Sequence, residues 1–214
     1  KIEIKKNKKD LIIFKKKFNK KIDNKKNTVF TTLKLLRSQN IISNFYKVLI
    51  TKNIPVFAGL GGGTGNSVSI VKHFLKNNIN EKLIKIIEKK IGSDFRLFLN
   101  NNSFQKKLGK VFKTQNKIQA FLTIIFPNVN CKTKNIYKSV KNFSRSSGGR
   151  YLKKMRNSGF LKNIKKDQND LQKIVEKKYP KISYLIKFIE IQKGCVLSRM
   201  TGSGSACFGV FKSK

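Results

Sequence analysis

Residues 55–67 have the composition of a loop that binds phosphate. The segment reads Pro-Val-Phe-Ala-Gly-Leu-Gly-Gly-Gly-Thr-Gly-Asn-Ser, with glycine at positions 59, 61, 62, 63 and 65. Glycine lets a backbone approach a ligand closely and point its N–H groups at an anion. The sequence YKVLI at residues 46–50 indicates a strand before this loop, and the apolar spacing of residues 68–75 indicates a helix after it. The partial positive charge at the start of such a helix favours a phosphate group.

Other interpretations of this segment fit the sequence less well. No Gly-Lys-Ser/Thr follows the glycines, so the segment is not a Walker loop, and the Gly-x-Gly-x-x-Gly register of a dinucleotide fold is not kept. A flexible linker is the structural alternative. A linker is not expected between a strand and a helix, and we expect Asn66 or Ser67 to cap that helix.

Asp94 is the candidate acid–base residue. Phosphoryl transfer to an alcohol needs a carboxylate near the hydroxyl group, to orient it and accept its proton. The chain has only ten acidic residues. Asp94 follows the amphipathic helix expected at residues 79–90 and the turn at Gly92, and it precedes an apolar strand expected at the sequence FRLF. An aspartate that serves only the turn is the structural alternative.

The charge of the chain suggests an anionic partner. Lys and Arg number 49 against ten acidic residues, which gives a formal net charge of +39. Lys, Asn, Ile and Phe recur throughout, so a composition bias explains the charge without a nucleic-acid or membrane partner. No RNP, zinc-finger or basic-zipper signature accompanies the lysines. We therefore predict no specific nucleic-acid binding, although a basic nucleic-acid-binding protein remains the alternative from another functional class.

The cysteines and the histidine do not form a metal site. Cys131, Cys195 and Cys207 are odd in number and lack Cys-x-x-Cys spacing, which is typical of reduced cytosolic thiols. His73 is the only histidine, and we expect it on the helix surface or against the core. No signal peptide or membrane-spanning run is present, so we predict a cytoplasmic protein without a membrane partner.

The remaining elements follow from hydrophobic patterning. Residues 1–27 are expected to form exposed antiparallel strands, and Asn27 opens a helix that ends near Leu36. Further strands are expected at residues 104–112 and 121–126, and further helices at 169–178 and 182–191. Residues 138–168 are polar and basic and predict a mobile loop with a short helix. Asp170 is expected to support the start of the helix that follows it.

Two glycine-rich segments carry a resemblance to a known family. Pro-x-x-x-Gly-Leu-Gly-Gly-Gly-Thr at residues 55–64 resembles the ATP-binding loop of the GHMP kinases, and it is most similar to their 4-diphosphocytidyl-2-C-methyl-D-erythritol kinase branch. Residues 197–211 (LSRMTGSGSACFGVF) resemble the second glycine motif of that family, a turn that feeds an apolar strand beside the ATP loop. The family usually has Ser-Ser or Ser-Asp where this chain has Thr64-Gly65, so one hydroxyl group is lost.

The resemblance implies a fold. We expect an α+β protein with the two-domain GHMP kinase fold and a left-handed β-α-β unit. An N-terminal ATP-binding domain (residues 1–117), similar to domain 2 of ribosomal protein S5, would precede a ferredoxin-like C-terminal domain (residues 118–214). The chain begins at Lys1 without methionine, and we expect a fragment or processed form that lacks the family's first strands. Those strands carry the Pro-x-Lys-x-Asn-Leu and Gly-Tyr-His motifs, and family members commonly continue beyond the residue that matches Lys214.

The resemblance also implies an activity. An ATP-dependent transferase of this branch moves the γ-phosphate of ATP, with Mg²⁺, to the 2-hydroxyl of 4-diphosphocytidyl-2-C-methyl-D-erythritol. This reaction belongs to the non-mevalonate pathway of isoprenoid synthesis. The implied partner is this small-molecule substrate, and the chain is expected to be a monomer or homodimer. Another GHMP kinase, acting on mevalonate-type or sugar substrates, is the alternative within the superfamily.

The family motifs carry site residues onto this sequence. Asp94 matches the catalytic aspartate, although Arg96 stands where the family usually has proline. The residues that match nucleotide-binding positions are Lys52, Pro55, Gly59, Leu60, Gly61, Gly62, Gly63, Thr64, Gly65 and Asn66. The residues that match substrate-binding positions are Asn27, Thr133, Tyr137, Gly202, Ser203 and Gly204. Tyr137 would stack on the cytosine base, and a helix cap is the alternative role of Asn27.

Overall fold

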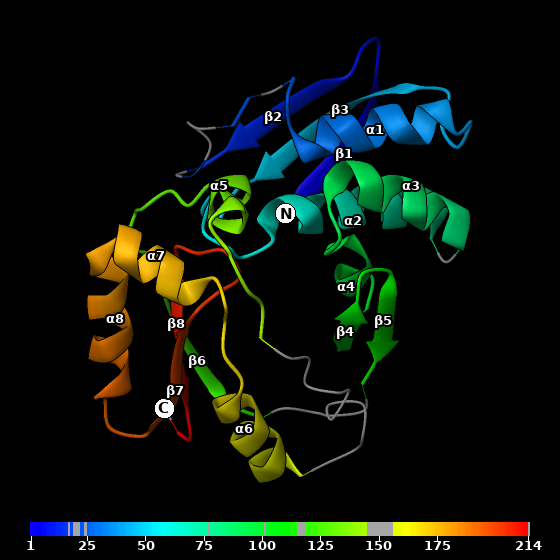
Figure 1. Ribbon diagram of the computed structural model, residues 1–214. Helices are drawn as coiled ribbons and strands as arrows, with labels where there is room; N and C mark the ends of the chain where they lie inside the picture. Colours follow the sequence, from blue (N-terminus) through cyan, green and yellow to red (C-terminus); the bar gives the residue numbers. More distant parts are fainter. Residues whose placement is uncertain are drawn as a thin grey trace. The chain divides into compact units, whose positions relative to one another are not determined.

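The chain forms two compact units (Figure 1). The computed structural model describes residues 1–16, 18, 22–23, 25–76, 78–100, 102–114, 119–144 and 156–213. Unit 1 comprises Lys1–Val56 and Gly61–Val111, and unit 2 comprises Phe57–Leu60 and Phe112–Lys214. The glycine-rich segment is therefore shared between the units. The domain boundary at residue 117 stays a prediction.

A three-stranded sheet lies at the centre of unit 1. Its strands are β1 (Ile2–Asn7), β2 (Leu11–Lys15) and β3 (Phe45–Thr51), in the order β1-β3-β2. β1 runs antiparallel to β3, as expected, whereas β2 runs parallel to it. The expectation of exposed antiparallel strands is wrong for β2, because helix α1 (Thr28–Ser38) carries the chain back before β3 begins. The β2 side chains Ile12 and Phe14 are buried in the core.

The helices described in unit 1 are α1, α2 (Gly62–Leu75), α3 (Glu81–Ile91) and the single turn α4 (Phe95–Phe98). The strand expected after Asp94 is wrong, because residues 95–98 form this helical turn with Phe95 buried in the core. The buried faces of α1 and α3 are aliphatic at helical spacing, as the sequence predicts. These faces pack on the strands in one core that includes Val29, Leu33, Leu36, Val48, Ile50, Ile70, Val71, Leu83, Ile87 and Phe95. His73 is exposed on α2, within 4.9 Å of the Phe74 ring (centroid to centroid).

The start of α2 differs from the expectation. Asn66 or Ser67 was expected to cap the helix, but both lie inside it, and the N-cap is Gly61 without a side-chain hydrogen bond. Gly61 has φ +62°, a left-handed conformation that glycine adopts at little cost. This turn directs the chain into the helix several residues earlier than a side-chain cap would. The glycines at positions 62, 63 and 65 are therefore helical.

A short ribbon follows α4. The single strand expected at residues 104–112 is instead two strands, β4 (Ser103–Lys107) and β5 (Lys110–Lys113), paired with each other. Gly109 lies between them with φ +72°, so the chain can reverse at this point.

Unit 2 is built on an antiparallel sheet. Its strands are β6 (Phe121–Ile125), β7 (Cys195–Met200) and β8 (Cys207–Phe211), in the order β6-β8-β7. The helices are α5 (Thr133–Lys138), α6 (Asn157–Lys166), α7 (Gln172–Lys178) and α8 (Pro180–Glu190). α8 packs on β7 and β8, and its Ile182, Ile186 and Ile189 are buried. The predicted strand 121–126 and the two last helices are confirmed, whereas residues 145–155 of the expected loop lie outside the described residues.

Asp170 does not cap α7. The helix begins two residues later, at Gln172, and the Asp170 carboxylate accepts hydrogen bonds from the Ser144 N–H (2.9 Å) and hydroxyl (3.0 Å). The neighbouring Asn169 takes the local turn instead, because its Oδ1 accepts from the Leu171 N–H at 3.1 Å. The expectation that Asp170 caps the helix is therefore wrong, and its charge effect on the helix start stays a prediction.

Candidate active site

The N-terminus of α2 is a backbone surface without room for side chains. A Cβ atom added at Gly61 would lie 2.2 Å from Cζ of Phe98, and one at Gly62 would lie 2.8 Å from Nζ of Lys52. The first intrahelical hydrogen bond runs from the Gly65 N–H to the Gly61 carbonyl (2.8 Å). The N–H groups that precede it, at residues 62–64, are those a helix leaves without internal acceptors. They form the positive end of the helix dipole.

Lys52 is a buried cation at this helix end. It is 5% exposed, and its ammonium group has no hydrogen bond or ion pair within the described part of the chain. Burial lowers the pKa of Lys52. A charged ammonium beside the positive end of a helix is unfavourable until an anion binds both groups. The arrangement therefore fits a ligand with phosphate oxygens.

Hydroxyl groups join the starts of α1 and α2. The Thr28 hydroxyl donates to the Gly63 carbonyl at 2.9 Å, and the Ser67 hydroxyl lies 3.3 Å from the Thr28 carbonyl and 3.4 Å from the Gly63 carbonyl. Asn27 caps α1, since its Oδ1 accepts from the Phe30 N–H at 3.0 Å. The alternative role of Asn27 as a helix cap is thus confirmed, and its contact with a substrate stays a prediction.

Asp94 directly precedes α4, which lies against the glycine residues of α2. Its side chain is exposed, whereas the next residue, Phe95, is fully buried in the core of unit 1. At the other end of the turn, the Phe98 ring packs against Gly61 and Gly65. The structure therefore holds the candidate carboxylate on the element that contacts the predicted phosphate loop.

The first part of the glycine-rich segment belongs to unit 2. The Thr201 hydroxyl lies 3.2 Å from the Ala58 carbonyl oxygen and 3.1 Å from that of Gly59, and the Ala206 N–H donates to Ala58 at 3.0 Å. Gly59 has φ +71°, and a Cβ added there would lie 2.3 Å from the Thr201 carbonyl oxygen. The two glycine motifs of the sequence therefore pack directly on each other at this point.

Two predicted substrate residues meet in unit 2. The hydroxyl groups of Thr133, at the start of α5, and of Ser203 lie 2.8 Å apart. Ser203 is 7% exposed and stands between Gly202 (φ +46°) and Gly204 (φ +80°). Tyr137, further along α5, is 52% exposed.

Sequence reasoning missed the residue that fixes the second glycine turn. The Asn169 amide donates to the carbonyl groups of Met200 (3.1 Å) and Gly202 (2.8 Å). The side chain thus binds both ends of the Met200–Gly202 turn. An asparagine just before a helix indicates a local turn, but its contacts with a segment some 30 residues away leave no pattern in the local sequence. The roles of Thr28, Ser67 and Phe98 were missed for the same reason.

Comparison with known proteins identifies the family. A sequence profile of the C-terminal region of GHMP kinases matches residues 140–214. A protein named 4-diphosphocytidyl-2-C-methyl-D-erythritol kinase from Pelagibacter ubique (strain HTCC1062) is 33% identical over 207 residues, which cover 92% of this chain and 71% of that protein. The chain belongs to the 4-diphosphocytidyl-2-C-methyl-D-erythritol kinase family. A kinase of the same name from Wolbachia sp. subsp. Brugia malayi (strain TRS) is 30% identical over 201 residues. The match covers 91% of this chain and 68% of that protein.

Solved structures share the fold of this GHMP kinase. A crystal structure of 4-(cytidine 5'-diphospho)-2C-methyl-D-erythritol kinase matches with a TM-score of 0.69 at 17% identity, over 99% of this chain and 76% of that one. A homoserine kinase from Cytophaga hutchinsonii ATCC 33406 matches equally well, with a TM-score of 0.69 at 18% identity over 100% and 76% of the two chains. The two-domain GHMP kinase fold is confirmed, and the structural likeness alone does not distinguish substrates.

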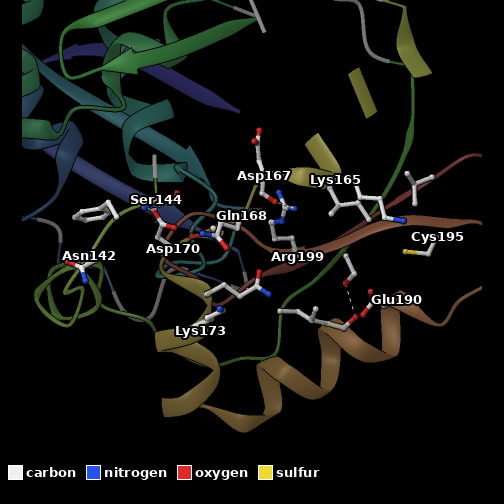
Figure 2. A pocket seen from close by; sticks show the side chains of 17 residues that line it. Asn142, Ser144, Lys165, Asp167, Gln168, Asp170, Lys173, Glu190, Cys195 and Arg199 are labelled. Atoms are coloured by element: carbon white, nitrogen blue, oxygen red, sulfur yellow. Dashed lines mark hydrogen bonds between the residues drawn. The ribbon is translucent and has the colours of Figure 1, made fainter. Parts of the chain in front are cut away.

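A separate cavity of about 760 Å³ in unit 2 does not belong to the predicted site (Figure 2). None of the predicted site residues lines it. The charges of its lining balance, since it contains three basic and three acidic side chains, and Arg199 donates a hydrogen bond to the backbone carbonyl oxygen of Asp167. The charged residues are Lys165, Lys173, Arg199, Asp167, Asp170 and Glu190. This balance gives the cavity no preference for an anion such as a nucleotide.

The cysteines of this kinase do not form a reactive site. All three are free, and burial raises the pKa of Cys207 to about 11 and also raises the pKa of Cys131 and Cys195. Among the described residues, no group of three His, Cys, Asp or Glu side chains could hold a metal ion. Within the same residues, no helix is both long and apolar enough to cross a membrane.

Proposed function

We propose that this chain transfers the γ-phosphate of ATP to the 2-hydroxyl of 4-diphosphocytidyl-2-C-methyl-D-erythritol. Membership of the kinase family supports the reaction and the substrate. The observation that carries the proposal is the buried Lys52, which has no anionic partner among the described residues and lies beside the glycine N-terminus of the 14-residue helix α2. A helix end and a cation of this kind suit the phosphates of a nucleotide.

The chain would bind the nucleotide phosphates mainly with backbone N–H groups. The N–H groups of Gly62, Gly63 and Thr64 precede the first hydrogen bond of α2 and supply donors, while Lys52 supplies charge. The lack of Cβ atoms at Gly61 and Gly62 leaves room for the Phe98 ring and for the Lys52 ammonium beside this helix end. We propose that Pro55, Gly59, Leu60, Gly65 and Asn66 shape the rest of this site, as in the family motif.

When bound, ATP with Mg²⁺ supplies the phosphoryl group and part of the neutralising charge. The Asp94 carboxylate and the Thr64 hydroxyl are oxygen groups of unit 1 that would be available to the cation. Mg²⁺ usually needs only one or two protein ligands beside phosphates and water. We therefore propose that the cation enters with the nucleotide, without a separate metal site.

Asp94 would act on the acceptor. Its exposed carboxylate would orient the substrate hydroxyl and accept its proton as the phosphoryl group moves. We propose that Thr133, Tyr137 and the turn at residues 202–204 contact the cytidylyl part of the substrate, with the Tyr137 ring as a stacking surface for the base. Asn27 would contribute near the substrate in addition to capping α1. We propose that the protein is a monomer or homodimer and that it is located in the cytosol.

Nucleotide binding tests the role of Lys52. In the protein expressed from the complete reading frame, Lys52→Met should weaken ATP binding by about 10- to 100-fold, because a charge-assisted hydrogen bond contributes roughly 1.5–3 kcal/mol. The matched control is Lys47→Met, which removes an exposed ammonium from β3, the strand that ends one residue before Lys52. It should leave the affinity within about twofold of wild type, since exposed charges are screened. Equal affinities of both variants would contradict the proposed phosphate site.

Cytidine dependence tests the substrate. The cytidylyl substrate should stimulate ADP release, whereas mevalonate, homoserine and sugars should not. Stimulation by one of these other alcohols would support kinase activity but assign it to a different substrate. A steep salt-dependent affinity for single or duplex nucleic acid, without ATP binding, would instead favour the nucleic-acid alternative.

A further inference from the structure

Arg96 is bound by two of the ten acidic residues of this strongly basic chain. Its guanidinium donates two hydrogen bonds to Glu88, from Nε to Oε1 (3.0 Å) and from Nη2 to Oε2 (2.9 Å). A third runs from Nη1 to Oε2 of Glu81 at 2.7 Å. Both carboxylates lie on α3, so the three bonds tie α4 to the helix before it.

This ion pair is shielded from solvent. The side chains of Arg96 and Glu88 are 12% and 13% exposed, whereas that of Glu81 is 58% exposed. A bidentate pair with little exposure is stronger and less screened than a surface ion pair. The hydrogen bond with Arg96 lowers the pKa of Glu81, and the bonds with Glu88 and Glu81 raise that of Arg96. The Arg96–Glu88 bonds therefore contribute most to holding α4.

α4 needs such support. A helix of four residues is not stable by itself, since forming the first turn fixes several residues for one hydrogen bond. The hydrogen bonds of this turn are long, at 3.3 Å for Phe98 N–H to the Asp94 carbonyl and for Leu99 N–H to the Arg96 carbonyl. Phe95 in the core, Arg96 on α3 and Phe98 on the glycine residues anchor the turn. Arg96 is the polar member of these three anchors, and it lies two residues after Asp94.

We infer that Arg96 is a positioning residue, which acts through Glu88 and α4 to hold the Asp94 carboxylate at the acceptor hydroxyl. This inference rests on the proposed function, in which Asp94 touches the substrate. Where the resembling family usually has proline, the ring restricts the backbone covalently. Arginine does not restrict the backbone in this way. In this chain, the ion pair of Arg96 with α3 restricts the position of α4 instead. Loss of the pair would let the carboxylate drift, while the phosphate loop on α2 would keep its structure.

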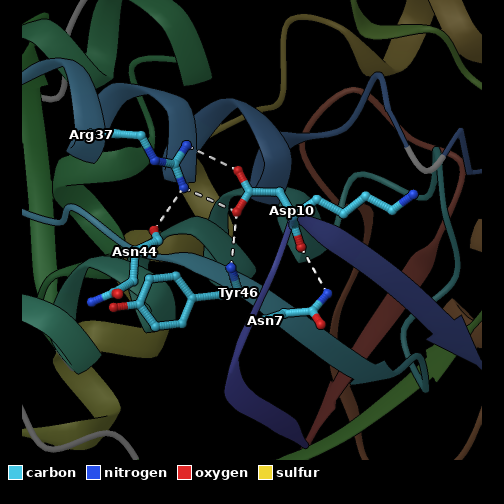
Figure 3. Close-up of polar contacts among 6 residues, drawn as sticks. Asn7, Asp10, Arg37, Asn44 and Tyr46 are labelled. Atoms are coloured by element: carbon cyan, nitrogen blue, oxygen red, sulfur yellow. Dashed lines mark hydrogen bonds and ion pairs between the residues drawn. The ribbon is translucent and has the colours of Figure 1, made fainter.

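Unit 1 contains a matched control for this pair (Figure 3). Arg37 on α1 donates two 3.0 Å hydrogen bonds to Asp10, which also accepts from the Tyr46 N–H at 3.0 Å. The geometry is bidentate in both pairs, and the Asp10 side chain is only 7% exposed. The Arg37–Asp10 pair fastens α1 to the sheet and does not involve α3 or α4. Its loss should cost stability without moving Asp94.

The experiment separates rate from stability and from nucleotide binding. Arg96→Met and Arg37→Met are compared in the protein from the complete reading frame, with kcat, KM for ATP and thermal unfolding measured for each. Arg96→Met should lower kcat by about 10- to 100-fold, because a misplacement of about 1 Å can cost that much. Its KM for ATP should stay within about twofold of wild type. Arg37→Met should lower the unfolding temperature while kcat stays within about twofold.

Milder variants keep the inference testable if Arg96→Met does not fold. Arg96→Lys keeps the positive charge but loses the planar guanidinium, and Glu88→Gln keeps the side-chain shape but replaces one acceptor oxygen with an NH₂ group. Neither variant can form the bidentate pair. Both should lower kcat, and the charge-swapped double variant Arg96→Glu with Glu88→Arg should recover at least part of the loss. Wild-type kcat in these variants, together with an inactive Asp94→Asn, would overturn this inference alone. Wild-type kcat in Asp94→Asn would instead overturn the proposed role of Asp94, on which this inference rests, and ADP release that does not depend on the cytidylyl substrate would overturn the proposed function.

Discussion

The two halves of the glycine-rich segment use glycine for opposite purposes. In unit 2, the backbone of residues 57–60 is bonded to protein. The carbonyl groups of Ala58 and Gly59 accept hydrogen bonds from the turn that contains Thr201 and Ala206. In unit 1, residues 61–65 leave the first N–H groups of α2 without internal acceptors, next to a buried lysine. One half is bound to protein, and the other is available to a ligand.

This difference shows that a glycine motif does not have a single role along its length. The neighbour of a Cβ added at Gly59 is backbone, which cannot move aside, whereas the neighbours at Gly61 and Gly62 are the ends of the side chains Phe98 and Lys52. Substitution in the first half should therefore damage the fold, and substitution in the second half should damage binding. The predictions below separate these effects.

The largest expected effect is that of Gly59→Ala. The new Cβ would lie 2.3 Å from the Thr201 carbonyl oxygen, and the residue would keep a left-handed conformation (φ +71°). Conformational strain and overpacking together should lower the free energy of unfolding by about 3 kcal/mol. Urea unfolding, followed by far-UV circular dichroism, measures this change. A loss below about 1 kcal/mol would show that the contact between the two glycine motifs is looser than described.

Gly61→Ala should have a smaller effect on stability and a clear effect on binding. The Phe98 ring is 40% exposed and can turn away from the new methyl group, so the strain of the left-handed conformation remains as the main cost, about 1–2 kcal/mol. The methyl group and the displaced ring would lie at the start of α2. We expect the ATP affinity, measured by calorimetry, to fall by about tenfold or more. Unchanged affinity would mean that phosphates do not approach this backbone.

The smallest expected effect is a pH dependence from Lys52. Because burial lowers its pKa in the folded protein, the unfolded chain holds the proton more tightly. Charged Lys52 thus destabilises the fold below its folded pKa, and this penalty disappears as the pH rises toward the ordinary lysine value of 10.5. Relative to Lys52→Met, the wild type without ligand should gain stability between pH 7 and pH 10. An equal pH dependence of both proteins in urea unfolding would show that Lys52 is solvated.

The sequence predicted local features well and spatial relations poorly. The glycine segment between β3 and α2, the amphipathic helix α3 and the apolar strand β6 follow from patterns within short windows, and the structure has all three. The parallel direction of β2 depends on the path of α1, and the early start of α2 depends on the left-handed conformation of Gly61. Neither is a property of local composition.

The candidate site shows the same division. Asp94 and the glycines were found from their types and their family motif, but the residues that hold them lie elsewhere in the sequence. Arg96 was noticed only as a departure from the usual proline, because its partners Glu81 and Glu88 precede it by 15 and 8 residues. A side chain that supports a site through a partner on another element gives no signal in a single sequence.

ADP release from ATP by the complete protein tests the central claim most directly. Release should depend on added 4-diphosphocytidyl-2-C-methyl-D-erythritol, and Asp94→Asn should reduce it by about 10²- to 10⁴-fold, the usual contribution of general acid–base catalysis. The control Glu3→Gln changes an exposed carboxylate whose ion pair is with Lys1, and it should retain the wild-type rate. Turnover of Asp94→Asn at the wild-type rate would contradict the assignment of Asp94 and the mechanism built on it.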